Sequence, residues 1–282
     1  MERSQRADHI LDVAGELLVA WGYGRVTIDE IARRAKVGKG TVYLHWKTKD
    51  ALLLAVMLKA QSHIHQRQLE LMRADPLEIL PSRMLRRHFL DFQGEPVLRA
   101  FYTDDADILG RLNDTAKKEF AELMAQGDRH LRRHLEVLRE HGLVRDDTDV
   151  HHQQYALLAT SNGFFTAEAL LSDRAPDTLE VRADILARTI RSALEVSADA
   201  GPGSGGPDSG PGSDLGSGPG SDSGSRSRSG SRSRSDSRSG SGPDAASARM
   251  RVAAAAAAPE IIACYEHFNE LCAQEMRRQI RD

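Results

Sequence analysis

Cysteine, aromatic side chains and long apolar runs are all scarce in this chain of 282 residues, which has two cysteines and 5% aromatic residues. Cys264 and Cys272 are too few for a disulfide framework, and neither has neighbouring ligands at the spacing of a zinc site. No apolar run approaches the roughly 18 residues of a transmembrane helix, and no signal-peptide segment follows the N-terminus. We therefore expect a soluble cytoplasmic protein that needs no metal or cofactor and does not associate with a membrane.

An excess of positive charge is lacking too, because 38 Lys and Arg residues are set against 41 Asp and Glu residues, for a net charge of −3. The whole molecule is therefore no polycation, and any contact with nucleic acid must use a local basic face. The sequence indicates such a face near the N-terminus, where basic residues gather at Arg33, Arg34, Lys36, Lys39, Lys47 and Lys49.

This basic segment has the pattern of two short helices joined by a turn. Thr27 and Glu30 have the spacing of a capping box, which starts a helix by satisfying its free backbone N–H groups. We expect Gly38 to supply the turn conformation that ends this helix. The next helix, from about Lys39 to Trp46, should bury Val42 and Trp46 and turn the following residues outward: Lys39, Gly40, Thr41, Tyr43 and His45. Two such helices are typical of a helix-turn-helix, whose second helix enters the major groove of DNA.

The same residues resemble a known family. Ile31-Ala-x-x-Ala-x-Val-Gly-Lys-Gly-Thr-Val-Tyr-x-His-Trp-Lys-x-Lys-Asp-x-Leu is similar to the signature of the TetR/AcrR transcriptional regulators, and the likeness is close from about Ile10 to Leu54. It implies an all-helical homodimer, with an N-terminal DNA-binding domain and a larger C-terminal domain for ligand sensing and dimerisation. It also implies which residues hold the backbone of double-stranded operator DNA: Thr27, Thr41, Tyr43, His45 and Lys49.

Base recognition would fall to the start of the second short helix, at Gly38, Lys39, Gly40 and Thr41. Lys39 can donate to guanine O6 and N7, and Tyr43 can touch a thymine methyl group. The two glycines let the backbone approach DNA closely but provide no side chain to distinguish bases. We therefore expect Arg25 or a residue in the N-terminal arm to add contacts.

The rest of the folded part should also be helical, because no segment alternates polar and apolar residues as a strand does. A first helix is predicted at 6–20, and a long one from the N-cap Thr48 to about Arg73. Five more are predicted at 77–93, 96–113, 114–141, 149–172 and 177–197. The predicted parts are a helix-turn-helix DNA-binding domain (1–50), a helical ligand-binding and dimerisation domain (51–197), a linker (198–243) and a C-terminal helical extension (244–282).

The predicted linker consists almost entirely of Gly, Ser, Pro, Asp and Arg, and includes an alternating Arg-Ser run. Such a segment cannot bury enough apolar surface to offset the entropy cost of ordering, so we expect it to be disordered. The extension after it should form one or two helices broken at Pro259. One face of this extension is apolar, so it must dock on the main body, a partner or another copy: Ile261, Tyr265, Phe268, Cys272 and Met276.

A ligand pocket between the helices of the second domain is implied by the resemblance, and such pockets combine apolar walls with a few polar groups. The candidate lining residues are His88, Phe92, Phe101, Tyr102, His134, Tyr155, Asn162 and Phe165. For any single residue of this set, filling of the helical core is the competing explanation. The small residues Ala156, Ala159 and Gly163 recur at helical spacing, so dimerisation is expected to use 149–172 together with 177–197.

These observations favour a sequence-specific DNA-binding repressor that a small-molecule inducer releases from a pseudo-palindromic operator. The alternative is an RNA-binding or protein-partner-binding protein that acts through the Arg-Ser-rich segment and the C-terminal helix. No Ser-His-Asp set, paired carboxylates or phosphate-binding glycine loop has a recognisable signature, so we do not expect an enzyme.

Overall fold

The computed structural model describes residues 3–171, 174, 178–196 and 243–280, and most of these are helical. Within these ranges β structure is limited to one antiparallel bridge between Val144 and Glu195. The predicted all-α fold is therefore confirmed. The predicted linker, 198–243, lies outside the described residues except for its last residue, Pro243. The elements are α1 (Arg3–Trp21), α2 (Ile28–Arg34), α3 (Lys39–His45), α4 (Lys49–Ala74), the 3₁₀ turn η1 (Pro76–Ile79), α5 (Pro81–Gln93), α6 (Pro96–Tyr102), α7 (Ala106–Leu109), α8 (Leu112–Glu119), α9 (Ala121–Glu140), α10 (Val150–Leu170), α11 (Leu179–Leu194) and α12 (Pro243–Gln279).

Three predicted helices are interrupted in the structure. The segment 77–93 begins as η1 and restarts at Pro81, whose ring favours the first position of a helix. The segment 96–113 divides into α6 and α7 because Asp104 adopts a positive φ of 56°, which a helix cannot accommodate. The segment 114–141 divides at Phe120, between α8 and α9. Short breaks of this kind leave the apolar pattern on both sides intact, so the pattern alone does not reveal them.

At Pro259 the sequence predicts a break, but in the structure α12 continues through this residue. A proline inside a helix removes one hydrogen bond and strains the preceding turn. Here the residues on either side of it, Ala257, Ala258 and Ile261, are buried against the body of the protein. Packing on both sides of the proline keeps the two halves in one helix, so the predicted break is wrong.

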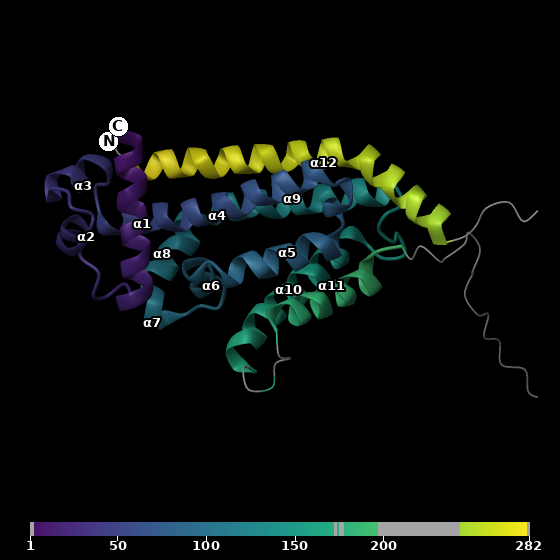
Figure 1. Cartoon of the computed structure of the whole chain (residues 1–282), viewed down its shortest axis with the longest axis horizontal. Helices are drawn as coiled ribbons and strands as arrows, with labels where there is room; N and C mark the ends of the chain where they lie inside the picture. Colours follow the sequence, from purple (N-terminus) through teal and green to yellow (C-terminus); the bar gives the residue numbers. More distant parts are fainter. Residues whose placement is uncertain (1–2, 172–173, 175–177, 197–242, 281–282) are drawn as a thin grey trace, which may run out of the picture.

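Two apolar cores lie along the molecule, and α4 belongs to both. The first core joins α1, α2 and α3 to the start of α4 and to residues of α6 to α8. The second core lies between the remainder of α4, α5, α9, α10, α11 and the first half of α12. Every residue from Leu52 to Leu58 is buried, so this part of α4 is covered on all sides. Figure 1 shows α4 running from the end that carries α2 and α3 into the rest of the molecule.

The C-terminal extension docks on the main body. α12 runs beside α4 and α9, as Figure 1 shows, and its residues Ile261 and Cys272 are buried. Near its end, Met276 and Ile280 pack against the first core. The apolar face predicted for this helix is therefore turned toward the body, and α12 spans both cores. None of the helices in the described ranges is long and apolar enough to cross a membrane.

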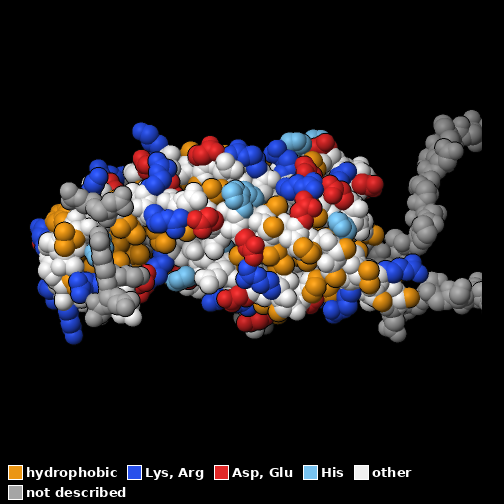
Figure 2. Space-filling view, turned by 90° about the horizontal axis from the view of Figure 1, so that it is seen from above, with side chains coloured by type: hydrophobic (Ala, Val, Ile, Leu, Met, Phe, Trp, Pro, Cys, Tyr) orange, Lys and Arg blue, Asp and Glu red, His pale blue; other side chains and the backbone are white. Residues whose placement is uncertain are grey.

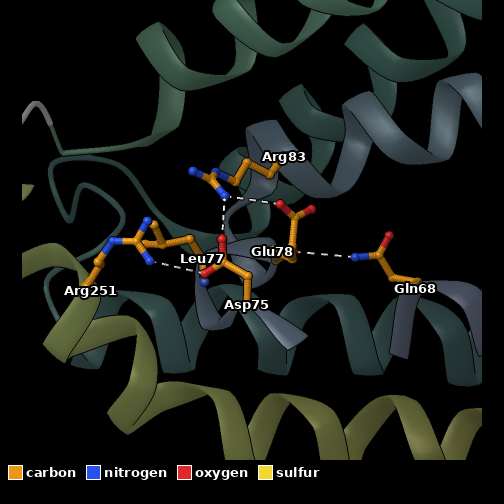
Figure 3. A network of polar contacts seen from close by, with 6 residues as sticks. All are labelled: Gln68, Asp75, Leu77, Glu78, Arg83 and Arg251. Atoms are coloured by element: carbon orange, nitrogen blue, oxygen red, sulfur yellow. Dashed lines mark hydrogen bonds and ion pairs between the residues drawn. The ribbon is translucent and has the colours of Figure 1, made fainter. Parts of the chain in front are cut away.

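A polar network fastens the start of α12 to the far end of α4 (Figure 3). Asp75, just after α4, lies 3.5 Å from Arg251 of α12 and 3.0 Å from Arg83 of α5. Arg83 also reaches Glu78 of η1 at 3.1 Å, and Gln68 of α4 donates to the Glu78 carbonyl oxygen. The backbone N–H of Leu77 and the two arginines lower the pKa of Asp75. Four elements are thus joined by one acidic residue.

A tight backbone contact joins α1 to α7. Gly22 follows α1 with a positive φ of 72°, and a Cβ atom placed on it would lie 2.4 Å from the carbonyl oxygen of Asp107. The next residue, Tyr23, donates its backbone N–H to the carbonyl oxygen of Ile108 at 2.8 Å. A side chain at position 22 would therefore be strained in itself and would separate these two backbones.

We expect Gly22→Ala to lower the free energy of unfolding by about 1–3 kcal/mol, because φ is positive and the added methyl group meets backbone. Gly24→Ala is the matched control, because a Cβ atom there meets nothing within 4 Å. Urea unfolding followed by circular dichroism measures both. Equal stability of the two variants would show that the Gly22 contact is not maintained in solution.

Candidate DNA-binding surface and ligand cavity

The helix-turn-helix begins at the predicted cap. The Thr27 side-chain oxygen accepts a hydrogen bond from the backbone N–H of Glu30 at 3.2 Å. The Glu30 carboxylate, however, turns to Arg33, whose Nε donates to it at 2.9 Å, so only half of the predicted capping box forms. This guanidinium lowers the pKa of Glu30. Thr27 itself is exposed at the start of α2, where free backbone N–H groups can hold a phosphate.

The turn between α2 and α3 is made by Lys36 and not by Gly38. Lys36 has a φ of 56°, its N–H bonds to the Arg33 carbonyl oxygen, and the N–H of Val37 bonds to that of Ala32. This pair of bonds is a Schellman motif, in which the residue after the helix takes the left-handed conformation. Gly38 is extended, with φ −69° and ψ 145°, and is the N-cap of α3. The expectation that Gly38 supplies the turn conformation is therefore wrong.

The outer face of α3 carries most of the residues that the sequence predicts there. Val42 and Trp46 are fully buried, as expected, whereas Lys39, Gly40 and Tyr43 are exposed and Thr41 is half-buried. Sequence analysis missed Leu44, which is 66% exposed beside Tyr43. The sequence signal that could have identified Leu44 is its position directly after Tyr43, the tyrosine predicted to contact DNA. Together Tyr43 and Leu44 offer an apolar surface suited to thymine methyl groups.

His45 and Lys49 differ from their predicted orientation. His45 is only 4% exposed, and its ring centroid lies 5.2 Å from that of Trp46, so it faces inward and not toward the DNA. The ammonium group of Lys49 donates to the carbonyl oxygens of Tyr23 and Val26 at 2.9 and 3.0 Å. It also lies 3.8 Å above the Tyr23 ring, and burial lowers its pKa. In this conformation Lys49 fastens the α1–α2 loop to α4 and leaves no ammonium group free for a phosphate.

Basic side chains surround the exposed tip of the helix-turn-helix, and Figure 2 shows Lys and Arg side chains at this end of the molecule. Lys39 is paired with Asp29 at 2.8 Å, which raises its pKa, and both side chains are largely exposed. An exposed ion pair of this kind contributes little to stability, because water screens it. Exchange of Asp29 for a DNA phosphate would therefore cost little.

A cavity of about 520 Å³ lies in the second part of the molecule, between α4, α5, α6, α9, α10 and α12. Five of the predicted ligand residues line it: His88, Phe101, Tyr102, Asn162 and Phe165. Phe92 lies behind this wall, with its ring centroid 4.4 to 5.0 Å from those of His88, Tyr102 and Phe165. The structure thus gathers most of the predicted set around one space.

Besides Phe92, two predicted ligand residues do not line this cavity. Tyr155 is 75% exposed on the surface of α10, because it lies on the face opposite the buried Leu157 and Gln154. His134 is 1% exposed; its Nε2 donates to the Ile79 carbonyl oxygen at 2.8 Å, and its Nδ1 lies 3.1 Å from the Tyr265 hydroxyl group. His134 therefore connects η1, α9 and α12 as a core residue. The prediction of a ligand-facing position is wrong for both.

The sequence analysis missed several lining residues, and those on α4 and α12 contribute polar or aromatic groups. α4 contributes Gln61, His65 and Gln68, and α12 contributes Tyr265, Phe268 and Cys272. The apolar face of α12 is visible in the sequence, but its docking site is not, because the contacts join residues about two hundred positions apart. Among the described residues no group of three or more His, Cys, Asp or Glu side chains could hold a metal ion.

Burial keeps the ionisable groups of this wall uncharged near neutral pH. It lowers the pKa of His65 to about 3 and that of His88 to about 4, so both imidazoles are neutral. It also raises the pKa of Tyr102 and that of the Cys272 thiol to about 12. Lys117 and Asp128, the charged lining residues, are exposed. The arrangement suits a mostly apolar guest that hydrogen-bonds to neutral groups.

Comparison with known proteins identifies the helix-turn-helix segment. Residues 10–56 match the family described as bacterial regulatory proteins, tetR family. Residues 10–56 are thus a tetR-family domain within this chain.

Curated relatives match the same part of the chain. The A-factor receptor protein of Streptomyces griseus is 41% identical over 59 residues, which are 21% of this chain and 21% of that protein. The HTH-type transcriptional regulator AcrR of Shigella flexneri is 34% identical over 82 residues, 28% of this chain and 38% of that protein. QacR of Staphylococcus aureus is 42% identical over 50 residues, 18% and 27% of the two chains. The matches thus span about a fifth to two-fifths of these relatives.

One solved structure supports the fold beyond the tetR-family domain. FadR from Bacillus subtilis, in complex with stearoyl-CoA, superposes with a TM-score of 0.51 over 64% of this chain and 96% of that chain. The two sequences are 18% identical, so the likeness concerns the fold alone. The helical arrangement that follows the tetR-family domain is therefore one that a known regulator also has.

Removal of the Lys49 ammonium group should destabilise the tetR-family domain. Lys49→Met leaves the carbonyl oxygens of Tyr23 and Val26 without this donor, so we expect a loss of about 1–3 kcal/mol in the free energy of unfolding. Lys47→Met, at an exposed position two residues earlier, is the control and should change little. Chemical denaturation measures both. If Lys49→Met left the free energy of unfolding unchanged, the ammonium group would not be held by these carbonyl oxygens in solution and would be free to contact DNA.

Acid should destabilise the fold through His134. Burial lowers its pKa to about 4 from a usual value of 6.5, so the unfolded chain binds the proton more readily between these values. The free energy of unfolding should therefore decrease as the pH falls from 6.5 to 4, by at most about 1.4 kcal/mol per pH unit for this residue. Urea unfolding at several pH values checks this. His134→Gln should reduce the slope and His9→Gln, at an exposed position of α1, should not; an unchanged slope in both would contradict the assignment.

Proposed function

We propose that this protein is a sequence-specific DNA-binding transcriptional regulator. The observation that carries the proposal is α3, which presents Lys39, Gly40, Tyr43 and Leu44 on an exposed face within the segment that matches the tetR family. Relatives that match this segment are named HTH-type transcriptional regulators. Their names support regulation over catalysis, and the proposed location is the cytoplasm, where bacterial DNA lies.

We propose further that the regulator is a repressor, released from its operator by a small molecule in the cavity. The relative from Streptomyces griseus is named a receptor protein, and FadR was solved with stearoyl-CoA. In this chain α4 joins the two sites, because His65 lines the cavity and Lys49 fastens the tetR-family domain. A ligand acts only through different affinities for the two states, so bound operator must weaken ligand binding by the same factor.

Homodimerisation through α10 and α11 is part of the proposal. The exposed face of α10 carries Tyr155, Leu158 and Leu170, and the small residues Ala156, Ala159 and Gly163 are also exposed. A Cβ atom on Gly163 would meet nothing within 4 Å, so a second helix can approach closely there. A two-fold dimer would place its recognition helices about 34–36 Å apart, which requires a pseudo-palindromic operator.

The four-part division of the chain follows from this proposal. Residues 1–50 would bind DNA, 51–197 would bind ligand and dimerise, and 244–282 would support the second part from outside. The alternative, in which an RNA or protein partner binds the Arg-Ser-rich segment and the C-terminal helix, is weakened because α12 uses its apolar face against its own chain. The Arg-Ser-rich segment itself lies outside the described residues.

The deciding experiment is binding of the full chain to DNA upstream of its own gene, measured as a salt series. We expect tight, selective binding whose log affinity falls with log salt, because phosphate contacts release counterions. Tyr43→Ala and Lys39→Ala should each weaken binding about tenfold. Lys118→Ala, at an exposed position of α8 and outside the proposed dimer helices, is the matched control and should bind like the unaltered protein.

The two substitutions should also differ from each other. Lys39→Ala should reduce the salt slope, whereas Tyr43→Ala should act mainly on sequence preference. Binding that ignores sequence and both substitutions would overturn the proposed role of α3.

A further inference from the structure

The C-terminal helix forms one wall of the cavity, although it follows the rest of the fold only after a long segment of different composition. Tyr265, Phe268 and Cys272 recur at helical spacing on the face of α12 that meets α4 and α9. The Phe268 ring centroid lies 5.0 Å from that of His65 and 5.5 Å from that of His130. Phe268 is thus inserted between two helices of the body.

The body leaves room for this insertion at one residue. Gly127 of α9 provides the space, because a Cβ atom there would lie 3.2 Å from the Phe268 ring. On α12 itself, four residues after Phe268, Cys272 is only 1% exposed. Both residues line the cavity, so a guest inside it would touch α12 as well as α4.

Outside the cavity, polar contacts hold α12 in addition to its apolar packing on the two cores. Ser62 of α4 donates to Asn269 at 3.1 Å, Arg73 lies 2.5 Å from Glu266, and Arg133 lies 2.6 Å from Glu260. The charged side chains of these pairs are about two-fifths to a half exposed, and such pairs are individually weak. These polar pairs fix the position of the helix, whereas burial of its apolar face holds it against the body.

The space enclosed by this wall is apolar and uncharged inside. Its buried polar residues are Gln68, His65 and Ser161. His65 accepts a hydrogen bond from Gln61 through Nε2, at 2.7 Å, and its Nδ1 is buried with no hydrogen-bond partner among the described residues. Lys117, the lysine at the edge, is already paired with Asp104 at 2.9 Å. The other charged lining residue, Asp128, is exposed like Lys117. A charged guest would therefore lose its hydration without a buried opposite charge to replace it.

We propose that α12 completes the ligand site, and that the site selects an uncharged, predominantly apolar aromatic or aliphatic molecule that contacts Phe268 and Cys272. This inference rests on the proposed function, because it concerns the ligand of the same cavity. The two proposals are tested by different experiments. Operator binding tests the proposed regulator without ligand, whereas probe binding and thiol alkylation test the ligand site without DNA.

The test compares two fluorescent probes with one skeleton, N-phenyl-1-naphthylamine and its sulfonated form, 1-anilinonaphthalene-8-sulfonate. Fluorescence titration of the full chain should give an affinity at least about tenfold higher for the uncharged probe, because the sulfonate cannot be desolvated in this cavity. Equal or tighter binding of the sulfonate, or no binding of the uncharged probe, would overturn the proposed ligand class.

The role of α12 is tested with the two cysteines, which are the only thiols of the chain. Cys272→Phe fills the cavity and should reduce affinity for the uncharged probe at least about tenfold. Cys264→Phe is the matched control: it lies on the same helix, is half-buried and does not line the cavity, so affinity should be unchanged. Equal affinity of both variants would exclude α12 from the site.

A second readout avoids any dependence on how the Phe variants fold. In Cys264→Ser the only remaining thiol is Cys272, and its alkylation by iodoacetamide can be timed. The uncharged probe at saturation should slow this reaction about tenfold or more, because it covers the thiol and holds the wall closed. The sulfonated probe at the same concentration should not. Alkylation that ignores the uncharged probe would contradict direct contact with α12.

Discussion

The burial of α4 is the constraint on which the rest of the structure depends. From Leu52 to Leu58 it has no side open to solvent; this stretch belongs to the first core, and the second core begins at Ala60, two residues later on the same helix. A helix covered on all sides cannot rotate or slide without disturbing both cores, because protein interiors are close-packed. The tetR-family domain and the cavity therefore share one rigid element, with Lys49 at one end and His65 further along.

The junction between α1, α4 and the loop before α8 adds a polar clamp to this packing. Tyr23 donates its hydroxyl hydrogen to Asp50 at 2.6 Å, and Arg111 donates to the same hydroxyl oxygen at 2.7 Å. Lys49 lies over the Tyr23 ring and bonds to its carbonyl oxygen. A movement of α4 would thus carry the α1–α2 loop with it, which links the cavity to the surface proposed to bind DNA.

α12 gives this molecule a second element that spans both cores. Its Arg251 lies near Asp75 in the polar network of Figure 3. Further along, α12 passes the cavity at Phe268 and reaches the first core at Met276. Its outer surface mixes acidic and basic side chains, such as Glu266 and Arg277, so its outward side is polar while its inner side is apolar. The extension is thereby built into the fold of the body and does not stand as a separate domain.

Local patterns in the sequence were sufficient for the all-α class, the Thr27 and Thr48 caps, the buried Val42 and Trp46, and the apolar face of α12. Each of these depends on residues within a few turns of one helix, whose spacing is visible in the chain. Only the tertiary structure decided that Lys36 forms the turn, that His45 and Lys49 face inward, that Tyr155 is exposed and that α12 lines the cavity. The turn at Lys36 is set by local backbone hydrogen bonds. The other outcomes depend on which distant surfaces meet, and helical periodicity identifies an apolar face without identifying the surface that covers it.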